Sequence, residues 1–339
     1  MNILVIRFSA IGDVAMTVPV LNSFARSFPT HRLSLISNKR FEDLFFGMPD
    51  NFEFIGVNVK ADYNGIGGLL RLFSFLRRRE FQAVADFHGV LRSRVLSALF
   101  LITGVRVKSI RKGRFERWRA SRKWCKKNLE LDPMTTRYNE VLNRLGFSVE
   151  IKFRSIFGEG RGEFEKIRRF TGEKRDYRWV GIAPFAAHRG KIYPLEMMEC
   201  VVKNLTKLRN TVLFVFAYGE ETEKVERWEK NESVIVIKGQ LTMLEELILM
   251  SHLDVMLSMD SSNAHLASLV ATPVVSVWGA THPSLGFMGY GQSLENCIQA
   301  NMDCRPCSVF GKTPCIYKDY RCLSAIQPNL ISDTVKRYL

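Results

Sequence analysis

Several widespread signatures are absent from this sequence of 339 residues. Neither half carries a Gly-x-Gly-x-x-Gly fingerprint after its first predicted strand, and no Gly-x4-Gly-Lys-Ser/Thr loop is present. These two absences argue against an NAD-dependent enzyme and against a P-loop NTPase. No apolar run approaches the ~20 residues that a membrane-spanning helix needs. The N-terminus carries no convincing secretory signal because Arg7 and Asp13 interrupt it, so we expect a cytoplasmic protein.

Acidic residues are also scarce, with 34 Asp and Glu against 49 Lys and Arg, which gives a formal net charge of +15. Such a chain attracts anionic partners, which include nucleic acid, acidic lipid headgroups and phosphorylated sugars. The hydrophobic fraction of 46% is that of a folded protein. A chain of this length is too long for one ordinary core and fits two domains.

In the first half of the chain, short β-branched runs alternate with segments of helical periodicity, which is typical of α/β domains with a parallel sheet. The predicted strands are Asn2–Phe8, Arg32–Ile36, Phe52–Val57, Ala83–Phe87 and Val105–Ile110, and the predicted helices include Gly68–Arg78 and Leu91–Leu101. Another helix is expected after Thr17 as its cap, because Pro19 is tolerated in a first helical turn. This leaves Ser9–Met16 as an irregular loop that could hold a ligand, or as a plain turn with a solvated Asp13.

The second half repeats this alternation. Its predicted strands are Trp179–Pro184, Thr211–Tyr218, Ser233–Lys238, Leu253–Met259 and Pro273–Trp278, with predicted helices at Pro194–Leu208, Glu220–Lys230, Thr242–Ser251 and Ser262–Leu269. Two such arrays imply two doubly wound, Rossmann-like lobes that face each other across a cleft. We place the first domain at residues 1–157, a polar linker at 158–177, the second domain at 178–325 and a C-terminal helix at 326–339.

The segment Asp260–His265 follows a predicted strand and opens a predicted helix. Free backbone N–H groups and the helix dipole form an anion site at such a point, where Ser261 and Ser262 can also donate to phosphate oxygens. Asp260 would repel a diphosphate, so we expect it to cap the helix or to bind a ribose hydroxyl. His265 lies about one turn into the helix and leans back toward its start. An ordinary capped helix is the alternative interpretation.

A loop of small residues within Gly181–Pro194 also connects a predicted strand to a predicted helix. Its Arg189 and Lys191 could neutralise the charge that builds on a departing diphosphate, although a surface lysine in a loop is the alternative. Ligands of open α/β sheets bind just beyond the carboxyl ends of the strands. A carboxylate at such a position in one half, Asp13, and a polar helix start in the other therefore suggest an enzyme site built between two lobes.

Together these features resemble glycosyltransferase family 9, the lipopolysaccharide heptosyltransferases, over nearly the whole chain. Five segments in the same order carry the resemblance: Ser9–Val14 with Thr17–Pro19 behind it, Asp86–Ser93, Lys191–Pro194, Asp260–Ala267 and Val277–Pro283. Ser261-Ser262-Asn263 stands where the family has Thr-Gly-Pro, and Ala186-Ala187 where hydroxyl residues often contact phosphate. These departures leave a nucleotide sugar other than ADP-heptose open as the donor.

The resemblance implies a GT-B architecture and inverting transfer of a sugar from a nucleotide donor, usually ADP-heptose, to the inner core of lipopolysaccharide or lipid A. It implies that Asp13 is the general base that takes the proton of the acceptor hydroxyl, and that Lys191 is catalytic at the leaving diphosphate. We expect donor-binding residues at Arg189, Lys191, Asp260, Ser261, Ser262 and His265, and acceptor-binding residues at Arg7, Ser9, Gly12, His88 and Arg92. No metal and no cofactor are expected.

The range Arg106–Lys127 contains eleven Lys and Arg residues but a single Glu, interleaved with Phe115, Trp118 and Trp124. We expect this basic belt to bind the acidic, phosphorylated acceptor and the headgroups of the inner-membrane surface, because it lies in the lobe that carries Asp13. Nucleic-acid binding has the same electrostatics but is not the expected activity, and a solvated helix face is a further alternative. A sugar-nucleotide epimerase of the same two-lobed fold is an alternative enzyme.

Five of the seven cysteines lie near the C-terminus. Cys304, Cys307, Cys315 and Cys322 have a Cys-x2-Cys-x7-Cys-x6-Cys spacing that could suit zinc. A cytoplasmic location disfavours disulfides. We expect a loop without metal here.

Overall fold

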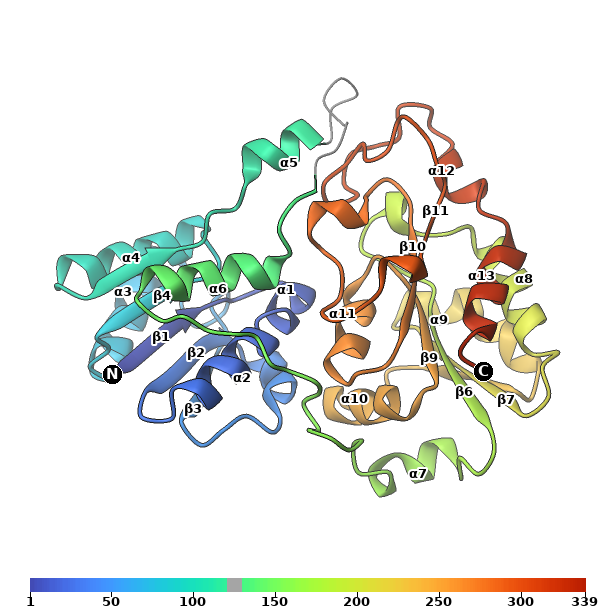
Figure 1. Ribbon diagram of the computed structural model, residues 1–339, viewed down its shortest axis with the longest axis horizontal. Coiled ribbons are helices and arrows are strands. Elements are labelled where there is room, and N and C mark those ends of the chain that lie inside the picture. The colour runs from blue at the N-terminus through green and yellow to red at the C-terminus, as the bar shows by residue number, and fades with distance from the viewer. Residues whose placement is uncertain (121–129) are drawn as a thin grey trace. The chain divides into compact units, whose positions relative to one another are not determined.

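The computed structural model describes residues 1–120 and 130–339, and the chain divides into two compact units. The first unit consists of Met1–Gly113 and Asp132–Gly158, and the second consists of Arg114–Leu131 and Glu159–Leu339 (Figure 1). Each unit contains a parallel sheet and the helices that pack on it. The predicted α/β fold class, with two doubly wound parallel sheets, is therefore confirmed.

The first unit is built on a five-stranded sheet. Its strands are β1 (Asn2–Ile6), β2 (Arg32–Asn38), β3 (Phe52–Val57), β4 (Ala83–Asp86) and β5 (Arg106–Ser109). They lie in the order β3-β2-β1-β4-β5, and every neighbouring pair is parallel. All five predicted strands are confirmed. The strand order reverses between β1 and β4, and ligands of doubly wound sheets bind at this kind of switch point.

The helices of the first unit form two layers. α3 (Gly65–Arg77) and α4 (Leu91–Ile102) contact each other, and their buried leucines share a core with Leu4 and Ile6 of β1. Alternate side chains of a strand point to opposite faces, so Ile3 and Val5 point toward the other layer. That layer contains α2 (Val18–Ser27) and α6 (Met134–Arg144), which contact each other, while η1 (Lys39–Phe45) follows β2.

The predicted irregular loop at Ser9–Met16 is wrong, because it contains the short helix α1 (Ile11–Ala15). The backbone N–H of Val14 donates to the Ala10 carbonyl at 2.9 Å, and the Thr17 hydroxyl donates to the Val14 carbonyl at 2.7 Å. These bonds give the chain a helical path before α2 begins. Thr17 does occupy the N-cap position of α2, as expected, but its side chain does not cap a helix N–H.

The second unit contains a six-stranded sheet in the order β11-β10-β9-β6-β7-β8. Its strands are β6 (Arg178–Ala183), β7 (Thr211–Phe216), β8 (Val234–Ile237), β9 (Val255–Met259), β10 (Val274–Trp278) and β11 (Cys297–Gln299). The five predicted strands are confirmed, and β11 was not predicted. All neighbours are parallel, and the order reverses between β6 and β9. The loops after these two strands carry the expected donor site.

The helices of the second unit also form two layers. α8 (Leu195–Leu205) contacts α13 (Pro328–Lys336), and α10 (Met243–His252) contacts α11 (Ser262–Leu269) and α7 (Glu165–Thr171). The remaining helices are α5 (Arg114–Ala120), α9 (Glu220–Val225), α12 (Arg321–Ser324) and the short 3-10 segments η2 (Arg189–Lys191), η3 (Glu226–Lys230), η4 (Pro283–Leu285) and η5 (Leu294–Asn296). The predicted capping box of α10 is confirmed: Thr242 Oγ1 accepts from the Glu245 N–H at 3.2 Å, and Glu245 Oε2 accepts from the Thr242 N–H at 2.8 Å.

Two polar segments lie elsewhere than expected. The stretch 158–177, expected to be a linker, packs on the second unit through α7, and the Gly162 N–H donates to Ser251 Oγ at 2.9 Å. The basic belt is divided, because Arg114–Leu131 belongs to the second unit while the residues up to Gly113 belong to the first. The Leu131 N–H donates to the Ser284 carbonyl at 2.8 Å. The argument that the whole belt lies in the unit of Asp13 is therefore wrong; Trp124 lies outside the described residues.

Candidate active site

Arg7 and Asp13 form the centre of the candidate site in the first unit. Arg7 follows β1 and is buried, and its Nη1 donates to the Phe87 carbonyl at 2.9 Å. Its Nη2 lies 2.5 Å from Asp13 Oδ2, whereas the Asp13 side chain remains 29% exposed. A buried guanidinium needs a counter-charge, so this ion pair orients the carboxylate of Asp13 while leaving it in contact with solvent.

Tyr138 on α6 holds the same region from the other side. Its hydroxyl donates to the Asp13 carbonyl at 3.2 Å, and its ring stacks on Phe87 with the centroids 4.7 Å apart. The Arg7 guanidinium lies 5.9 Å from the centre of the Tyr138 ring. Both the side chain and the backbone of Asp13 are therefore fixed by buried groups.

Asp86 organises the loop that follows β4. Its buried Oδ1 accepts from the N–H groups of His88 at 2.9 Å and Gly89 at 2.8 Å, and its Oδ2 accepts from Ser93 Oγ at 3.1 Å. Gly89 has φ +58°, and a Cβ there would lie 3.1 Å from Ile110 Cγ2. The segment Asp86–Ser93 is thus a rigid turn that leads directly into α4, and Asp86 has a structural role in it.

His88, expected to contact the acceptor, is an uncharged hydrogen-bonding group. Its Nδ1 accepts from the Phe8 N–H at 3.4 Å, which places the ring hydrogen on Nε2. Burial, together with the positive charges of Arg7 and Lys112, lowers the pKa of His88 to about 3. At neutral pH this side chain can therefore donate a hydrogen bond but cannot bind an anion by charge.

The other three expected acceptor residues lie at the same edge of the sheet or beside it. Ser9 is exposed at the end of the segment after β1, and Gly12 is half-buried within α1, where its carbonyl accepts from the Met16 N–H at 3.0 Å. Arg92 lies in the first turn of α4, and its Nη2 is 3.5 Å from Asn64 Oδ1. Asn64 caps α3, so the starts of α3 and α4 lie together.

In the second unit, three loops meet at Asp260. Its buried Oδ2 lies 2.9 Å from Lys191 Nζ and accepts from Thr281 Oγ1 at 2.7 Å. Lys191 belongs to the loop after β6, Asp260 directly follows β9, and Thr281 follows β10. This arrangement holds the ammonium group of Lys191 at the carboxyl edge of the sheet.

The structure corrects one of the two roles expected for Asp260. Ser261, rather than Asp260, occupies the N-cap position of α11, and the Asp260 carboxylate instead binds Lys191 and Thr281. Ser261 Oγ lies 3.2 Å from Ser258 Oγ. Ser262 is the first residue of α11 and is half-buried, so the α11 start is a polar, partly accessible helix terminus beside Lys191.

Close backbone approaches support the position of Lys191. The Ala280 N–H donates to the Gly190 carbonyl at 2.8 Å, and a Cβ on Gly279 would lie 2.4 Å from that carbonyl oxygen. Gly311 has φ +77°, and a Cβ there would lie 2.8 Å from Lys191 Cγ. The Lys191 side chain is therefore packed along the backbone of the segment around Gly311.

Arg305, which lies in the segment before Gly311, donates hydrogen bonds to the loop after β10. Its buried guanidinium donates to the carbonyls of Gly279, Ala300 and Thr281, the last at 3.0 Å. Arg189, an expected donor residue, points elsewhere: its Nη1 donates to the Ile192 carbonyl at 2.7 Å, and its guanidinium lies 5.2 Å from the centre of the Tyr320 ring. The loop after β6 thus brings Lys191, but not the Arg189 head group, to Asp260.

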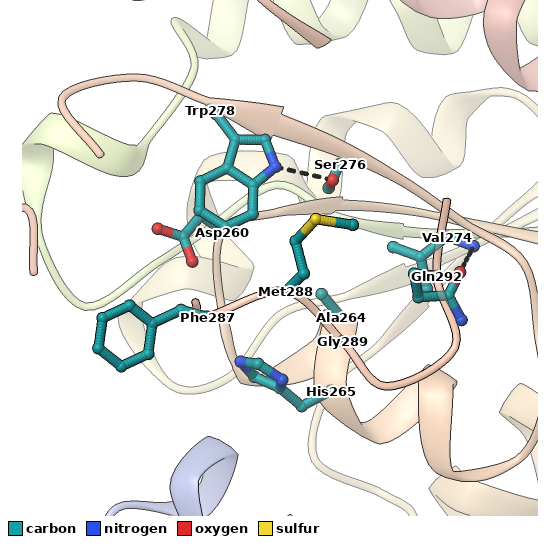
Figure 2. Close-up of a pocket in the computed structure, with 10 residues that line it drawn as sticks. All are labelled: Asp260, Ala264, His265, Val274, Ser276, Trp278, Phe287, Met288, Gly289 and Gln292. Carbon is teal, nitrogen blue, oxygen red and sulfur yellow. Dashed lines mark hydrogen bonds between the residues drawn. The ribbon is translucent and has the colours of Figure 1, made fainter. Parts of the chain in front are cut away.

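A small pocket borders Asp260. Figure 2 shows its lining, which comes from α11, from β10 and from the segment after η4: Asp260, Ala264, His265, Val274, Ser276, Trp278, Phe287, Met288, Gly289 and Gln292. Trp278 Nε1 donates to Ser276 Oγ at 2.8 Å. Asp260 and His265, both expected at the donor site, therefore share one pocket with two aromatic rings.

Sequence reasoning missed Tyr138, Thr281 and Arg305 as parts of the site. A signal was available for Tyr138, because Met134, Tyr138, Val141 and Leu142 have helical spacing and form the buried stripe of α6. Thr281 lies inside a recognised segment, Val277–Pro283, but only the fold pairs it with Asp260. Arg305 carries no local signal.

The cysteine-rich segment contains free thiols. Cys304, Cys307 and Cys315 are partly buried and Cys322 is buried. Burial raises the pKa of Cys322 to about 11, so its thiol is protonated at neutral pH. Within residues 1–120 and 130–339, no group of three or more His, Cys, Asp or Glu side chains is placed to hold a metal ion. Over the same residues, no helix has the length and apolar character needed to cross a bilayer.

Two doubly wound α/β units, each with polar groups at the carboxyl edge of its sheet, are the architecture of GT-B glycosyltransferases. The family model for glycosyltransferase family 9 (heptosyltransferase) matches residues 69–318. The chain belongs to this family and is a glycosyltransferase.

Individual relatives agree with this assignment. The chain is 23% identical over 297 residues to the lipopolysaccharide core heptosyltransferase OpsX of Haemophilus influenzae, a match that covers 83% of this chain and 80% of that protein. It superposes on ADP-heptose LPS heptosyltransferase II of E. coli with a TM-score of 0.72 and 15% identity, covering 100% of this chain and 98% of that one. A family 9 glycosyltransferase of Veillonella parvula gives a TM-score of 0.73 at 18% identity, covering 99% and 96% of the two chains.

Proposed function

We propose that this enzyme transfers a heptosyl group from ADP-heptose to a hydroxyl group of the lipopolysaccharide inner core, with inversion at the anomeric carbon. The family assignment and the heptosyltransferase activity of the relatives support this proposal. The observation that carries the mechanism is the partly exposed Asp13 carboxylate, oriented by buried Arg7 and Tyr138 at the switch point of its sheet.

The second unit is proposed to bind the donor. Lys191 and the N-terminus of α11 provide positive charge at one edge of the sheet, which suits a diphosphate. Asp260 holds the Lys191 ammonium group through Oδ2, and its second carboxylate oxygen is the proposed acceptor for a hydroxyl group of the donor. His265, which lines the small pocket beside Asp260 together with Trp278 and Phe287, is the further donor contact that we propose in this unit.

The first unit is proposed to bind the acceptor. Asp13 accepts the proton of the acceptor hydroxyl, while Arg7 and Tyr138 act as positioning residues. His88, which is uncharged, donates a hydrogen bond from Nε2 to an acceptor oxygen. Ser9, Gly12 and Arg92 complete the proposed acceptor contacts, and of these only Arg92 brings a positive charge to an acidic sugar.

The reaction balances with these residues alone. The acceptor oxygen forms a bond to the anomeric carbon as its proton moves to the Asp13 carboxylate. The bond between that carbon and the diphosphate oxygen breaks on the opposite face, and its electron pair leaves with ADP. Lys191 and the backbone N–H groups at the start of α11 stabilise the charge that develops on the diphosphate. We propose that no metal or cofactor takes part.

The Asp13→Asn variant tests this assignment. We expect it to lower the turnover number by about 10²–10⁴-fold, the range typical for loss of a general base. ADP release from ADP-heptose, with lipid A that carries inner-core sugars but no heptose as acceptor, measures the rate. Calorimetry should show donor binding close to that of the wild type. Asp50→Asn, which changes an exposed aspartate of the same unit, is the matched control; near-normal turnover of Asp13→Asn would overturn the proposed base.

The donor is tested by comparing ADP-, UDP-, GDP- and CDP-sugars in the same calorimeter. Tightest binding of ADP-heptose supports the proposal. Tighter binding of another nucleotide sugar would show that this sugar is the donor, and the assignment as a transferase would still stand. Incubating the enzyme with the donor alone, followed by proton NMR of the sugar, identifies a sugar-nucleotide epimerase, because the two epimers give different spectra. Fluorescence anisotropy with labelled DNA or RNA, repeated at increasing salt, identifies nucleic-acid binding.

A further inference from the structure

We propose that the outer surface of α3 and α4 docks on an anionic lipid bilayer. Both helices are long enough to present side chains on two sides, and each uses one side to cover the sheet. The other side carries large apolar residues that are open to solvent. We call this the α3–α4 surface; its exposed apolar members are Ile66, Leu70, Leu91, Leu101 and Ile102.

The exposure of these side chains is large. Ile66 is 74% exposed, Leu91 79% and Ile102 82%, whereas Leu72 and Leu96 on the inner side are fully buried. Single exposed apolar residues are common, but a cluster on two neighbouring helices indicates an interaction site. The ring of Phe73 lies 5.0 Å from that of buried Phe100, so the two helices pack directly against each other and their exposed residues lie on neighbouring elements.

The spacing within α4 places its exposed residues in one stripe. Leu91, Val95, Ala98 and Ile102 are separated by four, three and four residues, so they fall on one side of the helix. In α3, exposed Ile66 and Leu70 are separated by four residues, whereas Phe73 packs against the core shared with the sheet. Each helix therefore carries exposed apolar residues in addition to those that it buries against the sheet.

The charged residues around the α3–α4 surface indicate which partner binds it. Neither α3 nor α4 contains an acidic residue, whereas Arg71, Arg77, Arg92 and Arg94 lie within them. From residue 62 to residue 113 there are ten Lys and Arg but three acidic residues, Asp62, Glu80 and Asp86, and Asp86 is buried in its turn. Apolar side chains bordered by a clear excess of cations match an anionic membrane interface.

Other occupants fit less well. A second copy of the chain would bring two sets of arginines together across a shared apolar face, which like-charge repulsion disfavours. A nucleic acid would neutralise the arginines but would leave Ile66, Leu91 and Ile102 without an apolar partner. A bilayer offers both the acyl chains and the negative headgroups.

The surface also begins next to the candidate acceptor site. α4 starts three residues after His88, and the contact between Arg92 and Asn64 holds the starts of α3 and α4 together. Ile66 and Leu91 therefore lie close to the edge of the sheet where Asp13 is held. The link between this surface and the acceptor site rests on the proposed function. A lipid-anchored acceptor would reach Asp13 from the same membrane on which the helices dock.

Sedimentation with vesicles tests the proposal on the full chain. We expect binding to vesicles of phosphatidylcholine with phosphatidylglycerol, weaker binding to phosphatidylcholine alone, and a decrease with salt. The triple variant Ile66→Ser/Leu91→Ser/Ile102→Ser should bind at least about tenfold more weakly, because it removes the most exposed apolar groups. The matched control replaces three exposed apolar residues of the second unit by Ser: Leu294, Ile316 and Leu330.

Each outcome decides the proposal. Loss of binding in the triple variant, with the control variant unchanged and both melting like the wild type, supports it. Absence of wild-type binding to anionic vesicles, or equal binding of the triple variant, overturns it. A change in oligomeric state of the triple variant without any vesicle binding assigns the surface to a second copy. Because the assay contains neither donor nor acceptor, Asp13→Asn should bind vesicles like the wild type, which separates this proposal from the proposed function.

Discussion

Replacing Glu246 by Gln should stabilise the second unit at neutral pH and above. Glu246 lies in the first turn of α10 and is 6% exposed, and its Oε2 accepts from the Tyr218 hydroxyl at 2.8 Å. Burial raises the pKa of Glu246 from 4.5 to about 7, although the hydrogen bond from Tyr218 opposes this shift. The folded protein therefore holds a proton on Glu246 that the unfolded chain releases at lower pH.

The sign and size of the effect follow from this pKa. Between pH 4.5 and about 7 the folded state binds more protons than the unfolded state, so the free energy of unfolding falls as the pH rises through this window. One pKa unit corresponds to about 1.4 kcal/mol, so the loss amounts to about 3 kcal/mol when complete. The amide side chain of the Glu246→Gln variant would keep an oxygen that accepts from Tyr218, and it has no proton to lose in this pH range.

Urea unfolding of wild type and Glu246→Gln at pH values from about 5 to 8 measures the difference. All five tryptophans lie in the sequence of the second unit, so their fluorescence reports on that unit. We expect the variant to gain about 2–3 kcal/mol over the wild type between these pH values. Glu232→Gln, at an exposed glutamate of the same unit, is the control. A difference between Glu246→Gln and wild type that does not change with pH would refute the reasoning.

Two further predictions concern the candidate donor site. Lys191→Met should weaken binding of ADP-heptose by at least about tenfold, because it removes the cation that faces the diphosphate and leaves Asp260 without its ion pair; calorimetry measures this, and Lys207→Met, at an exposed lysine, should leave binding unchanged. Gly311→Ala should lower the free energy of unfolding by at least about 1 kcal/mol and weaken donor binding, because φ is +77° and the new Cβ would meet Lys191 Cγ at 2.8 Å. Unaltered stability and affinity in this variant would show that the segment yields without displacing Lys191.

Much of the fold follows from local patterns. Buried parallel strands are near-continuous apolar runs and are therefore easy to recognise in a sequence. The predicted ends of all ten strands lie within two residues of the observed ends. The start of α10 was predictable because Thr242 and Glu245 satisfy each other's backbone groups across a single turn. The start of α11 at Ser262 was predictable for the same reason of local chemistry, a polar segment directly after a buried strand.

The missed elements depend on more than local pattern. In α1, the carbonyls of Ala10 and Gly12 accept from N–H groups one turn later. The sequence did not indicate this helix, because Pro19 suggested that helical structure would begin only after Thr17. The second part of the basic belt contacts residues far along the chain: the Arg117 guanidinium lies 4.5 Å from the centre of the Phe287 ring, and beyond the belt the Leu131 N–H donates to the Ser284 carbonyl. Composition shows that the belt is rich in cations, but it does not show to which of the two units these residues belong.

By itself, the sequence determined two parallel α/β arrays and the loops in which Asp13, Lys191 and Asp260 lie, because strand burial and helix capping act over a few residues. Only the tertiary structure decided which side chains these residues meet: Arg7 and Tyr138 at Asp13, and Lys191 with Thr281 at Asp260. These partners are distant in sequence and become neighbours because parallel strands bring their carboxyl ends to one edge of a sheet. The ion pairs there depend on strand order, which hydrophobic periodicity does not encode.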